Sequence, residues 1–264
     1  MGKVITITNQ KGGVGKTTTA INLSATVAIA EFPTLLIDID PQSNATSGLG
    51  FDPREQRTNI YDVLINGTDP HQAIVKTETP FLSLLPSTIN LVGAEVELVG
   101  TEGRERMLFN VVEKLRNDFK FIFVDCPPSL GLLTLNGLVA ADTVLIPVQC
   151  EYFALEGLGQ LLNTVSMVQQ GLNPKLTIEG VIMTMFDGRL RLSNQILAEV
   201  KNYFGEKAYS TVISRNVRLS EAPSYGKPII MYDAASSGAK SYMEAAKEFL
   251  SRQTNSIQPQ TVSP

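Results

Sequence analysis

Two lysines and three glycines lie close together near the start of this chain. Residues 9–18 read Asn-Gln-Lys-Gly-Gly-Val-Gly-Lys-Thr-Thr, between a strand-like run at 4–8 and a helix-like run at 19–25. Free N–H groups of a first helical turn point at an anion, and the helix dipole favours negative charge there. The stretch therefore predicts a phosphate cradle, formed by Lys11, Gly12, Gly13, Val14, Gly15, Lys16, Thr17 and Thr18.

This stretch departs from the usual phosphate-binding pattern, G-x-x-x-x-G-K-[ST]. The first glycine of that pattern would fall on Gln10, and a second lysine, Lys11, follows instead. Glycines allow close backbone approach and positive φ angles. Lys16 can reach the β- and γ-phosphates of a nucleotide, and the Thr17 hydroxyl suits Mg²⁺. The alternative, a glycine turn that binds nothing, is disfavoured by the strand before it and the helix after it.

Two further apolar runs are followed by aspartates. Residues 35–37 lead to Asp38 and Asp40, which are followed by Pro-Gln, and residues 121–124 lead to Asp125. Side chains at i and i+2 of a strand point the same way, and α/β folds bind ligands at the carboxyl ends of their strands. Asp125 is expected to hold Mg²⁺ through water, because Mg²⁺ retains much of its hydration shell. The simpler alternative for Asp38 and Asp40 is that they only cap the next turn.

Apolar runs and helical patterns alternate along the chain. We predict strands at 3–8, 34–39, 82–85, 121–125, 143–148, 177–184 and 211–213, and helices at 17–30, 91–99, 103–117, 132–140, 155–170, 191–204 and 236–252. Several strands are apolar throughout, as in strands buried on both faces. The expected fold is a three-layer α/β/α P-loop NTPase with a mainly parallel central sheet flanked by helices. We expect one domain over 1–253 and a flexible polar tail over 254–264.

Composition indicates a globular α/β protein. Apolar residues make up 43% of the 264 residues and charged residues 18%, which argues against disorder. No apolar run reaches the roughly 18 residues of a membrane span, and the chain starts directly on a predicted strand, so no signal peptide is expected. Cys126 and Cys150 stand apart from any metal-binding pattern, as is usual for buried thiols in a reducing cytosol.

Charge is unevenly distributed. The chain carries a net charge of −4, but residues 188–252 hold ten Lys and Arg against six acids. Such an asymmetry favours a surface for a polyanion, although charges on helices are usually just a solvated face.

The motifs together resemble one family. Lys11–Thr18 resembles the deviant Walker A motif of the ParA/MinD class of P-loop ATPases, 38–42 resembles its A′ motif, and 121–125 resembles a Walker B strand. Residues 184–187 and 213–228 are similar to two further ParA signatures. In the second, Asn216 matches the family and Ser214 stands where proline is usual. The chain is identified as a member of the ParA family, of the short, Soj-like type.

The resemblance implies a mechanism. ATP and Mg²⁺ would bind at Lys16 and Thr17, with Asp125 in the outer metal shell and Asp38 near it. Asp40 would position the attacking water. Two subunits would close face to face, each placing Lys11 against its partner's phosphates, and hydrolysis would stay slow until a partner stimulates it. Asn216 is the expected contact to the adenine base, and the missing proline puts the contact at Ser214 in doubt.

The resemblance also implies partners. The ATP-bound homodimer would bind double-stranded DNA without sequence preference and act with a ParB-type centromere-binding protein in chromosome or plasmid segregation, in the cytoplasm on the nucleoid. The candidate DNA-binding residues are Arg189, Arg218, Lys201, Lys227, Lys240 and Lys247. Such contacts to phosphates supply affinity and no sequence readout.

Three alternatives remain open at this point. A MinD-like membrane ATPase would need a basic amphipathic C-terminal helix, which residues 253–264 do not offer. An iron–sulfur carrier of the same fold would need cysteines placed to bridge a dimer. A related ATPase that positions another cargo is compatible with the sequence.

Overall fold

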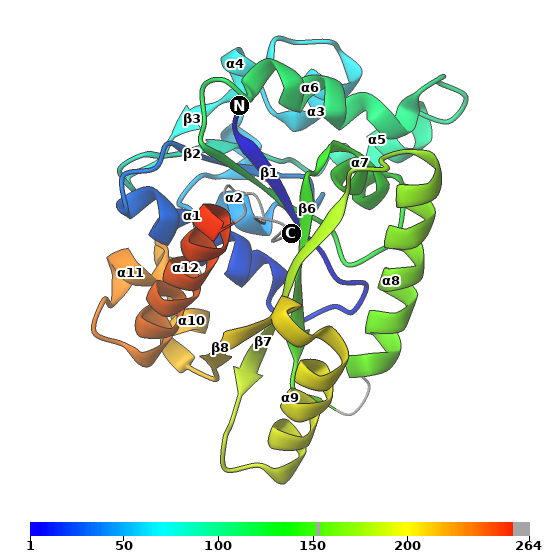
Figure 1. Ribbon diagram of the computed structural model, residues 1–264. Helices are drawn as coiled ribbons and strands as arrows, with labels where there is room; N and C mark the ends of the chain where they lie inside the picture. Colours follow the sequence, from blue (N-terminus) through cyan, green and yellow to red (C-terminus); the bar gives the residue numbers. More distant parts are fainter. Residues whose placement is uncertain (152–153, 256–264) are drawn as a thin grey trace, which may run out of the picture.

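One sheet forms the centre of the molecule (Figure 1). The computed structural model describes residues 1–151 and 154–255. The strands are β1 (Lys3–Ile7), β2 (Thr34–Asp38), β3 (Val75–Lys76), β4 (Leu82–Leu85), β5 (Phe121–Asp125), β6 (Thr143–Gln149), β7 (Thr177–Phe186) and β8 (Ala208–Ser214). Their order is β3-β4-β2-β5-β1-β6-β7-β8, and only the β3–β4 pair is antiparallel. The mainly parallel sheet is confirmed.

Helices cover both faces of this sheet (Figure 1). One face carries α1 (Lys16–Ile29), α2 (Asn44–Gly48), α10 (Val217–Glu221), α11 (Ile229–Tyr232) and α12 (Ser237–Asn255). The other carries α3 (Ile60–Ile65), α5 (Leu91–Glu97), α6 (Met107–Leu115), α7 (Leu132–Ala140), α8 (Ala154–Gly171) and α9 (Arg191–Phe204), with the short α4 (Pro70–Ala73) beside α3 and α6. This is the predicted three-layer α/β/α arrangement.

Strand β5 shows why the central strands are apolar throughout. Phe121 and Phe123 belong to the core under α1 and α12, whereas Ile122 and Val124 belong to the core under α6 and α7. Successive side chains of a strand point to opposite faces, and here helices bury both. The Phe249 ring of α12 packs on Phe121 with ring centroids 5.2 Å apart.

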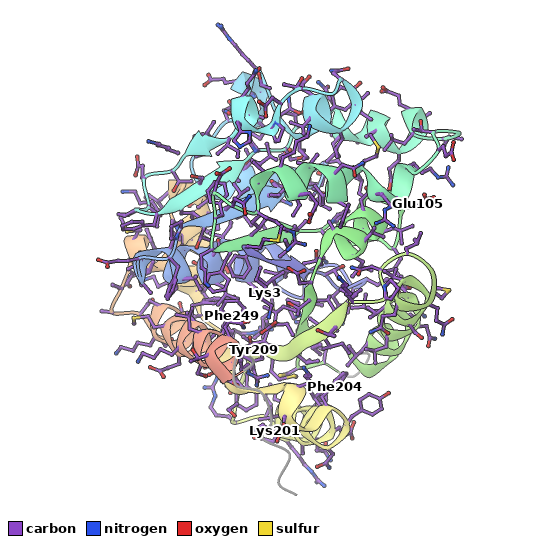
Figure 2. All side chains as sticks on the ribbon, turned by 45° about the horizontal axis from the view of Figure 1, so that its top comes forward. Lys3, Glu105, Lys201, Phe204, Tyr209 and Phe249 are labelled. Atoms are coloured by element: carbon purple, nitrogen blue, oxygen red, sulfur yellow. The ribbon has the colours of Figure 1, made fainter. Side chains whose placement is uncertain are left out.

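The sequence missed short elements and shifted several ends. Strand β3, helices α2, α3, α4, α10 and α11 and the 3₁₀ turns at Pro53–Glu55, Gly205–Lys207 and Ala222–Tyr225 were not predicted. The helix expected at 103–117 begins as a 3₁₀ turn, Arg104–Arg106, before α6. The strand expected at 211–213 begins earlier, because Tyr209 is fully buried and joins the core beside Phe249 (Figure 2).

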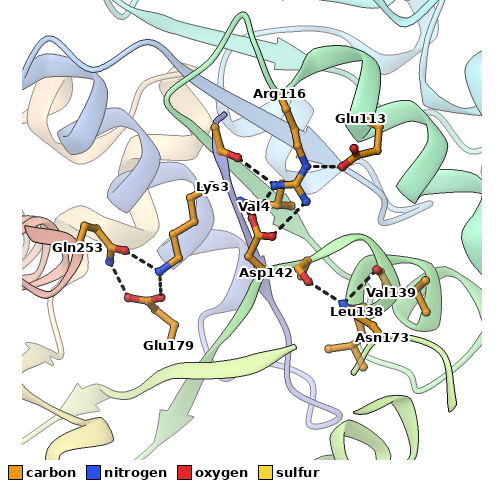
Figure 3. Close-up of polar contacts among 12 residues, drawn as sticks. Lys3, Val4, Glu113, Arg116, Leu138, Val139, Asp142, Asn173, Glu179 and Gln253 are labelled. Atoms are coloured by element: carbon orange, nitrogen blue, oxygen red, sulfur yellow. Dashed lines mark hydrogen bonds and ion pairs between the residues drawn. The ribbon is translucent and has the colours of Figure 1, made fainter. Parts of the chain in front are cut away.

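Helix α12 continues to Asn255, two residues into the tail predicted from residue 254. The Gln253 side chain donates to Glu179 Oε1 over 2.7 Å and accepts from Lys3 Nζ over 2.5 Å (Figure 3). These bonds fix the last turn of α12 to the starts of β1 and β7. The remainder of the predicted tail, 256–264, lies outside the described residues.

Among residues 1–151 and 154–255, no helix combines the length and apolarity that crossing a bilayer requires.

Candidate nucleotide site

The loop between β1 and α1 has the backbone of an anion cradle. Gly13 has φ +74° and Gly15 has φ +83°, a region where a side chain is strained. Gly15 directly precedes the first residue of α1, so the free N–H groups of that helix face the loop. The two glycines are therefore required by the turn.

The Lys16 side chain is buried against this loop. Only 6% of the residue is exposed, and its Nζ donates to the Lys11 carbonyl oxygen over 2.9 Å. Burial lowers the pKa of the Lys16 ammonium, while the carboxylates of Asp125 and Asp40 act in the opposite direction. The Lys16 ammonium therefore interacts electrostatically with both predicted acids.

Two neighbouring strands hold the cradle in place. Asn9 donates from Nδ2 to the Pro147 carbonyl oxygen over 2.8 Å, and its Oδ1 accepts from the Lys11 N–H over 3.0 Å. Thr184 Oγ1 donates to the Val14 carbonyl oxygen over 2.8 Å. We did not predict these supporting roles, although polar residues in strands beside a phosphate loop are a usable signal.

Asp38 is buried and fully hydrogen-bonded. Its Oδ2 accepts from Thr46 N over 2.9 Å and from Thr46 Oγ1 over 2.7 Å, and its Oδ1 accepts from Asp40 N over 3.0 Å. Burial raises the pKa of Asp38 to about 6, and the bonds from Thr46 oppose part of that rise. Its oxygens are committed to the loop that carries Asp40, so Asp38 supports that loop in this structure.

Asp125 stands next to Asp38 without such support. The two residues are register partners of β2 and β5, and Asp125 is fully buried. Within the described residues neither of its carboxylate oxygens has a hydrogen-bond partner. Burial raises its pKa well above the usual value, the Asp38 charge adds to the rise, and the nearby Thr17 hydroxyl opposes it.

This carboxylate fits a hydrated Mg²⁺. A buried charge without a partner is costly, so the position favours a cation. The described part of the chain contains no cluster of three acidic, histidine or cysteine ligands. Mg²⁺ suits such a site, since it is usually held by one or two carboxylates, water and phosphates.

Asp40 lines the same cavity as Lys16 and Thr17. It is 5% exposed, and its Oδ1 accepts from Gln42 N over 2.9 Å. Its carbonyl oxygen accepts from Ser87 Oγ over 2.8 Å, and Ser87 N donates to Thr46 Oγ1 over 3.0 Å. Thr46 and Ser87, which the sequence did not single out, therefore tie the two acids of the A′ motif together.

Lys11 is paired within its own chain. Its Nζ lies 2.9 Å from Glu151 Oε2, and both side chains are partly exposed. Glu151 was not foreseen as a site residue. The structure thus shows Lys11 held by an acid of the same subunit.

Two adjoining cavities open onto the cradle. One, of about 500 Å³, is lined by Lys16, Thr17, Thr18 and Asp40 together with Lys227. The other, of about 420 Å³, is lined by Thr184, Met185, Ser214 and Asn216 among others. The size and position of the second cavity suit a nucleotide base.

Asn216 lines this base-sized cavity but already makes two hydrogen bonds. Its Oδ1 accepts from Arg218 N over 2.8 Å at the start of α10, and its Nδ2 donates to Ser237 Oγ over 2.5 Å. Its predicted contact to the base would compete with these bonds and stays a prediction. Ser214, on the same wall, ends strand β8.

The candidate DNA-binding residues do not form one cluster. Arg189 and Arg218 follow the carboxyl ends of β7 and β8, and each is paired with an acid. Arg189 Nη2 lies 2.6 Å from Asp187 Oδ2, and Arg218 Nη1 lies 2.8 Å from Glu221 Oε2.

The candidate lysines lie on other parts of the molecule. Lys201 lies at the far end of α9 (Figure 2), where it lines a separate cavity of about 810 Å³. Lys247 pairs with Glu244 at 2.7 Å. Lys240 is exposed near the start of α12, and Lys227 lines the cavity of about 500 Å³ beside Lys16.

Comparison with known proteins identifies the family of this chain. A family model described as an AAA domain matches residues 2–178. The sporulation initiation inhibitor protein Soj of Bacillus subtilis (strain 168) is 56% identical over 248 residues, 94% of this chain and 98% of that protein. The chromosome partitioning protein ParA of Myxococcus xanthus (strain DK1622) is 52% identical, over 96% of this chain and 90% of that protein. The chain belongs to the Soj/ParA family of chromosome-partitioning ATPases.

A solved structure extends the comparison to the whole fold. A protein of Mycobacterium smegmatis titled cobyrinic acid a,c-diamide synthase, with an ATP analog and magnesium bound, superposes with a TM-score of 0.87 at 37% identity. The alignment covers 100% of both chains. Membership of the Soj/ParA family confirms the resemblance seen in the motifs, and the family is one of P-loop ATPases.

Proposed function

We propose that this Soj/ParA-family chain binds ATP with Mg²⁺, closes into a homodimer, and in that form binds DNA without sequence preference to segregate a chromosome or plasmid with a ParB-type partner. One observation carries the nucleotide step. Lys16 at the start of α1 lines the same cavity as Thr17 and Asp40, and Asp125, whose charge acts on Lys16, ends the strand next to β2. The Lys16 ammonium, which can bind phosphate, thus lies at the same edge of the sheet as two carboxylates. One of them, Asp125, is available to a metal ion, and the other is Asp40.

Each part of the site has a role in this proposal. The N–H groups of residues 12–18 and the Lys16 ammonium bind the β- and γ-phosphates. Thr17 and Asp125 hold Mg²⁺, which neutralises charge on the phosphate oxygens when bound. Asp40 orients the attacking water, and Asp38 keeps the Asp40 loop in place through Thr46.

Lys11 completes the site only after a rearrangement. In this proposal its ammonium leaves Glu151 and reaches the phosphates of the second subunit, where it offsets charge that develops during phosphoryl transfer. A site that is completed only by a second subunit predicts slow turnover by the single chain. It also makes ATP the signal for dimerisation.

The basic residues supply the proposed DNA contacts. Arg189 and Arg218 follow neighbouring strands, and exposed ion pairs contribute little to stability, so phosphates can displace Asp187 and Glu221. Dimerisation doubles the number of basic residues on one particle, which links ATP binding to DNA affinity by avidity. This dimer would act in the cytoplasm on the nucleoid.

The deciding experiment is binding of the full chain to a random-sequence duplex with no nucleotide, with ADP and with ATP, across a salt series. Binding only with ATP, weakening steeply with salt, is the expected result. Lys16→Ala should remove ATP binding and DNA binding together, whereas Arg218→Glu should weaken DNA binding and leave ATP turnover unchanged. Equal binding in all nucleotide states, or normal ATP affinity of Lys16→Ala, would contradict the proposal.

A further inference from the structure

Helix α5 has apolar side chains on two opposite sides. Leu91, Ala94 and Leu98, at helical spacing, are buried against the core. A second set, which we name the α5 ridge, consists of Ile89, Val92, Val96 and Val99, with exposures of 62%, 54%, 73% and 67%. The backbone bonds Val92 N to Ile89 O and Val99 N to Val96 O continue the helical turns at both ends.

The side chains of the α5 ridge form one continuous apolar stripe. Its spacing of three, four and three residues places all four side chains along one side of the helix. A surface helix needs one apolar stripe to pack on its protein, and the inward residues already provide it. No described residue covers the second stripe sufficiently to bury it. Contiguous exposed apolar stripes of this kind mark sites of protein interaction.

The charge around the ridge indicates the kind of partner. Residues 88–103 carry three acids, Glu95, Glu97 and Glu102, all exposed, and no lysine or arginine. Apolar residues at helical spacing beside carboxylates fit an amphipathic segment with apolar anchors and basic flanks. A second copy of this surface would bring like charges together, which disfavours pairing of two ridges.

The ridge is connected to the nucleotide site at two points. Ser87, just before it in the chain, donates to the Asp40 carbonyl oxygen over 2.8 Å. Glu95 lies over the loop that follows Asp125, so close that a Cβ at Gly131 would stand 2.6 Å from Glu95 Oε1. A shift of α5 therefore bears directly on the Asp40 backbone and on the loop after Asp125.

We propose that the α5 ridge docks a basic amphipathic segment of the protein that stimulates ATP turnover, and that docking acts on the site through Ser87 and the Glu95–Gly131 contact. This inference rests on the proposed function, since it names the surface at which the ParB-type partner would act. The ridge lies outside the phosphate cradle, so stimulation and basal turnover are separable.

The test uses full chains and the ParB-type protein of the same genome. The ridge variant is Val92→Glu with Val96→Glu, and the control is Met167→Glu, which introduces a glutamate at an exposed apolar position of α8 away from the ridge. The ridge variant should retain basal turnover within about twofold and still dimerise with ATP, while stimulation falls at least tenfold. Met167→Glu should be stimulated like the wild type.

Direct binding checks the charge argument. Two short fluorescent peptides are compared, one with leucine and lysine at helical spacing and one in which glutamate replaces lysine. The basic peptide should bind the wild type more tightly than the acidic one, and Glu95→Lys with Glu97→Lys should remove that preference.

Three outcomes would overturn the inference. Full stimulation of the ridge variant means that the partner binds elsewhere. Loss of ATP-dependent dimerisation in that variant means that the ridge is a contact between copies of this chain. Equal binding of both peptides means that the acids do not select the partner. A wild type without ATP turnover or ATP-dependent DNA binding is a distinct result, which rejects the proposed function itself.

Discussion

Asp38 and Asp125 are register partners at the ends of β2 and β5, yet Asp38 accepts three hydrogen bonds and Asp125 has none from the described residues. The two carboxylates therefore differ in role. Asp38 holds the backbone of the Asp40 loop. Burial of the Asp125 carboxylate without a partner destabilises the nucleotide-free protein, and a bound cation would offset this cost.

Replacing Asp125 should raise the stability of the protein and lower its activity. Asp125→Asn should raise the free energy of unfolding of the nucleotide-free protein by about 1–3 kcal/mol, because it removes a buried acid whose charged form has no hydrogen-bond partner. It should lower Mg²⁺-dependent ATP turnover at least about 100-fold. Denaturant unfolding and a phosphate-release assay measure the two effects. Glu78→Gln, the same change on an exposed acid, should alter neither, and a destabilised but active Asp125→Asn would contradict the assignment.

The pKa of Asp38 predicts how stability depends on pH. Because its folded pKa is raised to about 6, the folded state binds this proton more tightly than the unfolded state does. The free energy of unfolding without nucleotide should fall as pH rises from about 4 to about 6, by roughly 3 kcal/mol from this group, and then level off. Urea unfolding across that range, compared with Asp38→Asn, isolates the contribution. A variant with the same pH slope as the wild type would refute it.

The hydroxyl of Thr46 should matter more to catalysis than to binding. Thr46→Val keeps the shape of the side chain but removes a donor to Asp38 and an acceptor for Ser87 N. We expect kcat to fall about tenfold while ATP affinity is retained, because Asp40 loses its support. Thr46→Ser restores the hydroxyl and should recover most of the rate. Similar rates for the valine and serine variants would show that the hydroxyl has no such role.

The Lys11–Glu151 pair should oppose dimerisation. Glu151→Gln frees the ammonium, and since both side chains are partly exposed the pair is worth up to about 1 kcal/mol. The ATP concentration at the midpoint of dimerisation, followed by light scattering, should fall by up to about fivefold. Adding Lys11→Gln should cancel that gain. An increase of the midpoint in Glu151→Gln would mean that Glu151 contributes to the dimer itself.

The sequence predicted the parts of this molecule that depend on local pattern. The strands 82–85 and 121–125 and the helices 132–140 and 191–204 have the predicted ends. Their strong periodicity and clear flanks made this possible. Strand β3, with two residues, is too short for any period and forms only because β4 pairs with it.

The supporting contacts of the site could not be read in the same way. Ser87 meets Asp40 across 47 positions, and Thr184 meets Val14 across 170, so no spacing rule connects them. The pattern of 91–99 correctly predicted a helix, but an apolar side facing the core and an apolar side facing out look alike in sequence. Only the packed structure distinguishes Leu91 from Val92.

The position of α12 has a consequence for how the chain folds. Tyr242, Ala245 and Phe249 of α12 complete the core on α1, and Tyr242 lies within 3.1 Å of Thr19 through the two hydroxyls. Strand β1, the first to be synthesised, pairs with β5 and β6, which come far later. Formation of the nucleotide site therefore requires closure of long loops, and we expect slow folding with α1 exposed to aggregation until α12 has emerged from the ribosome.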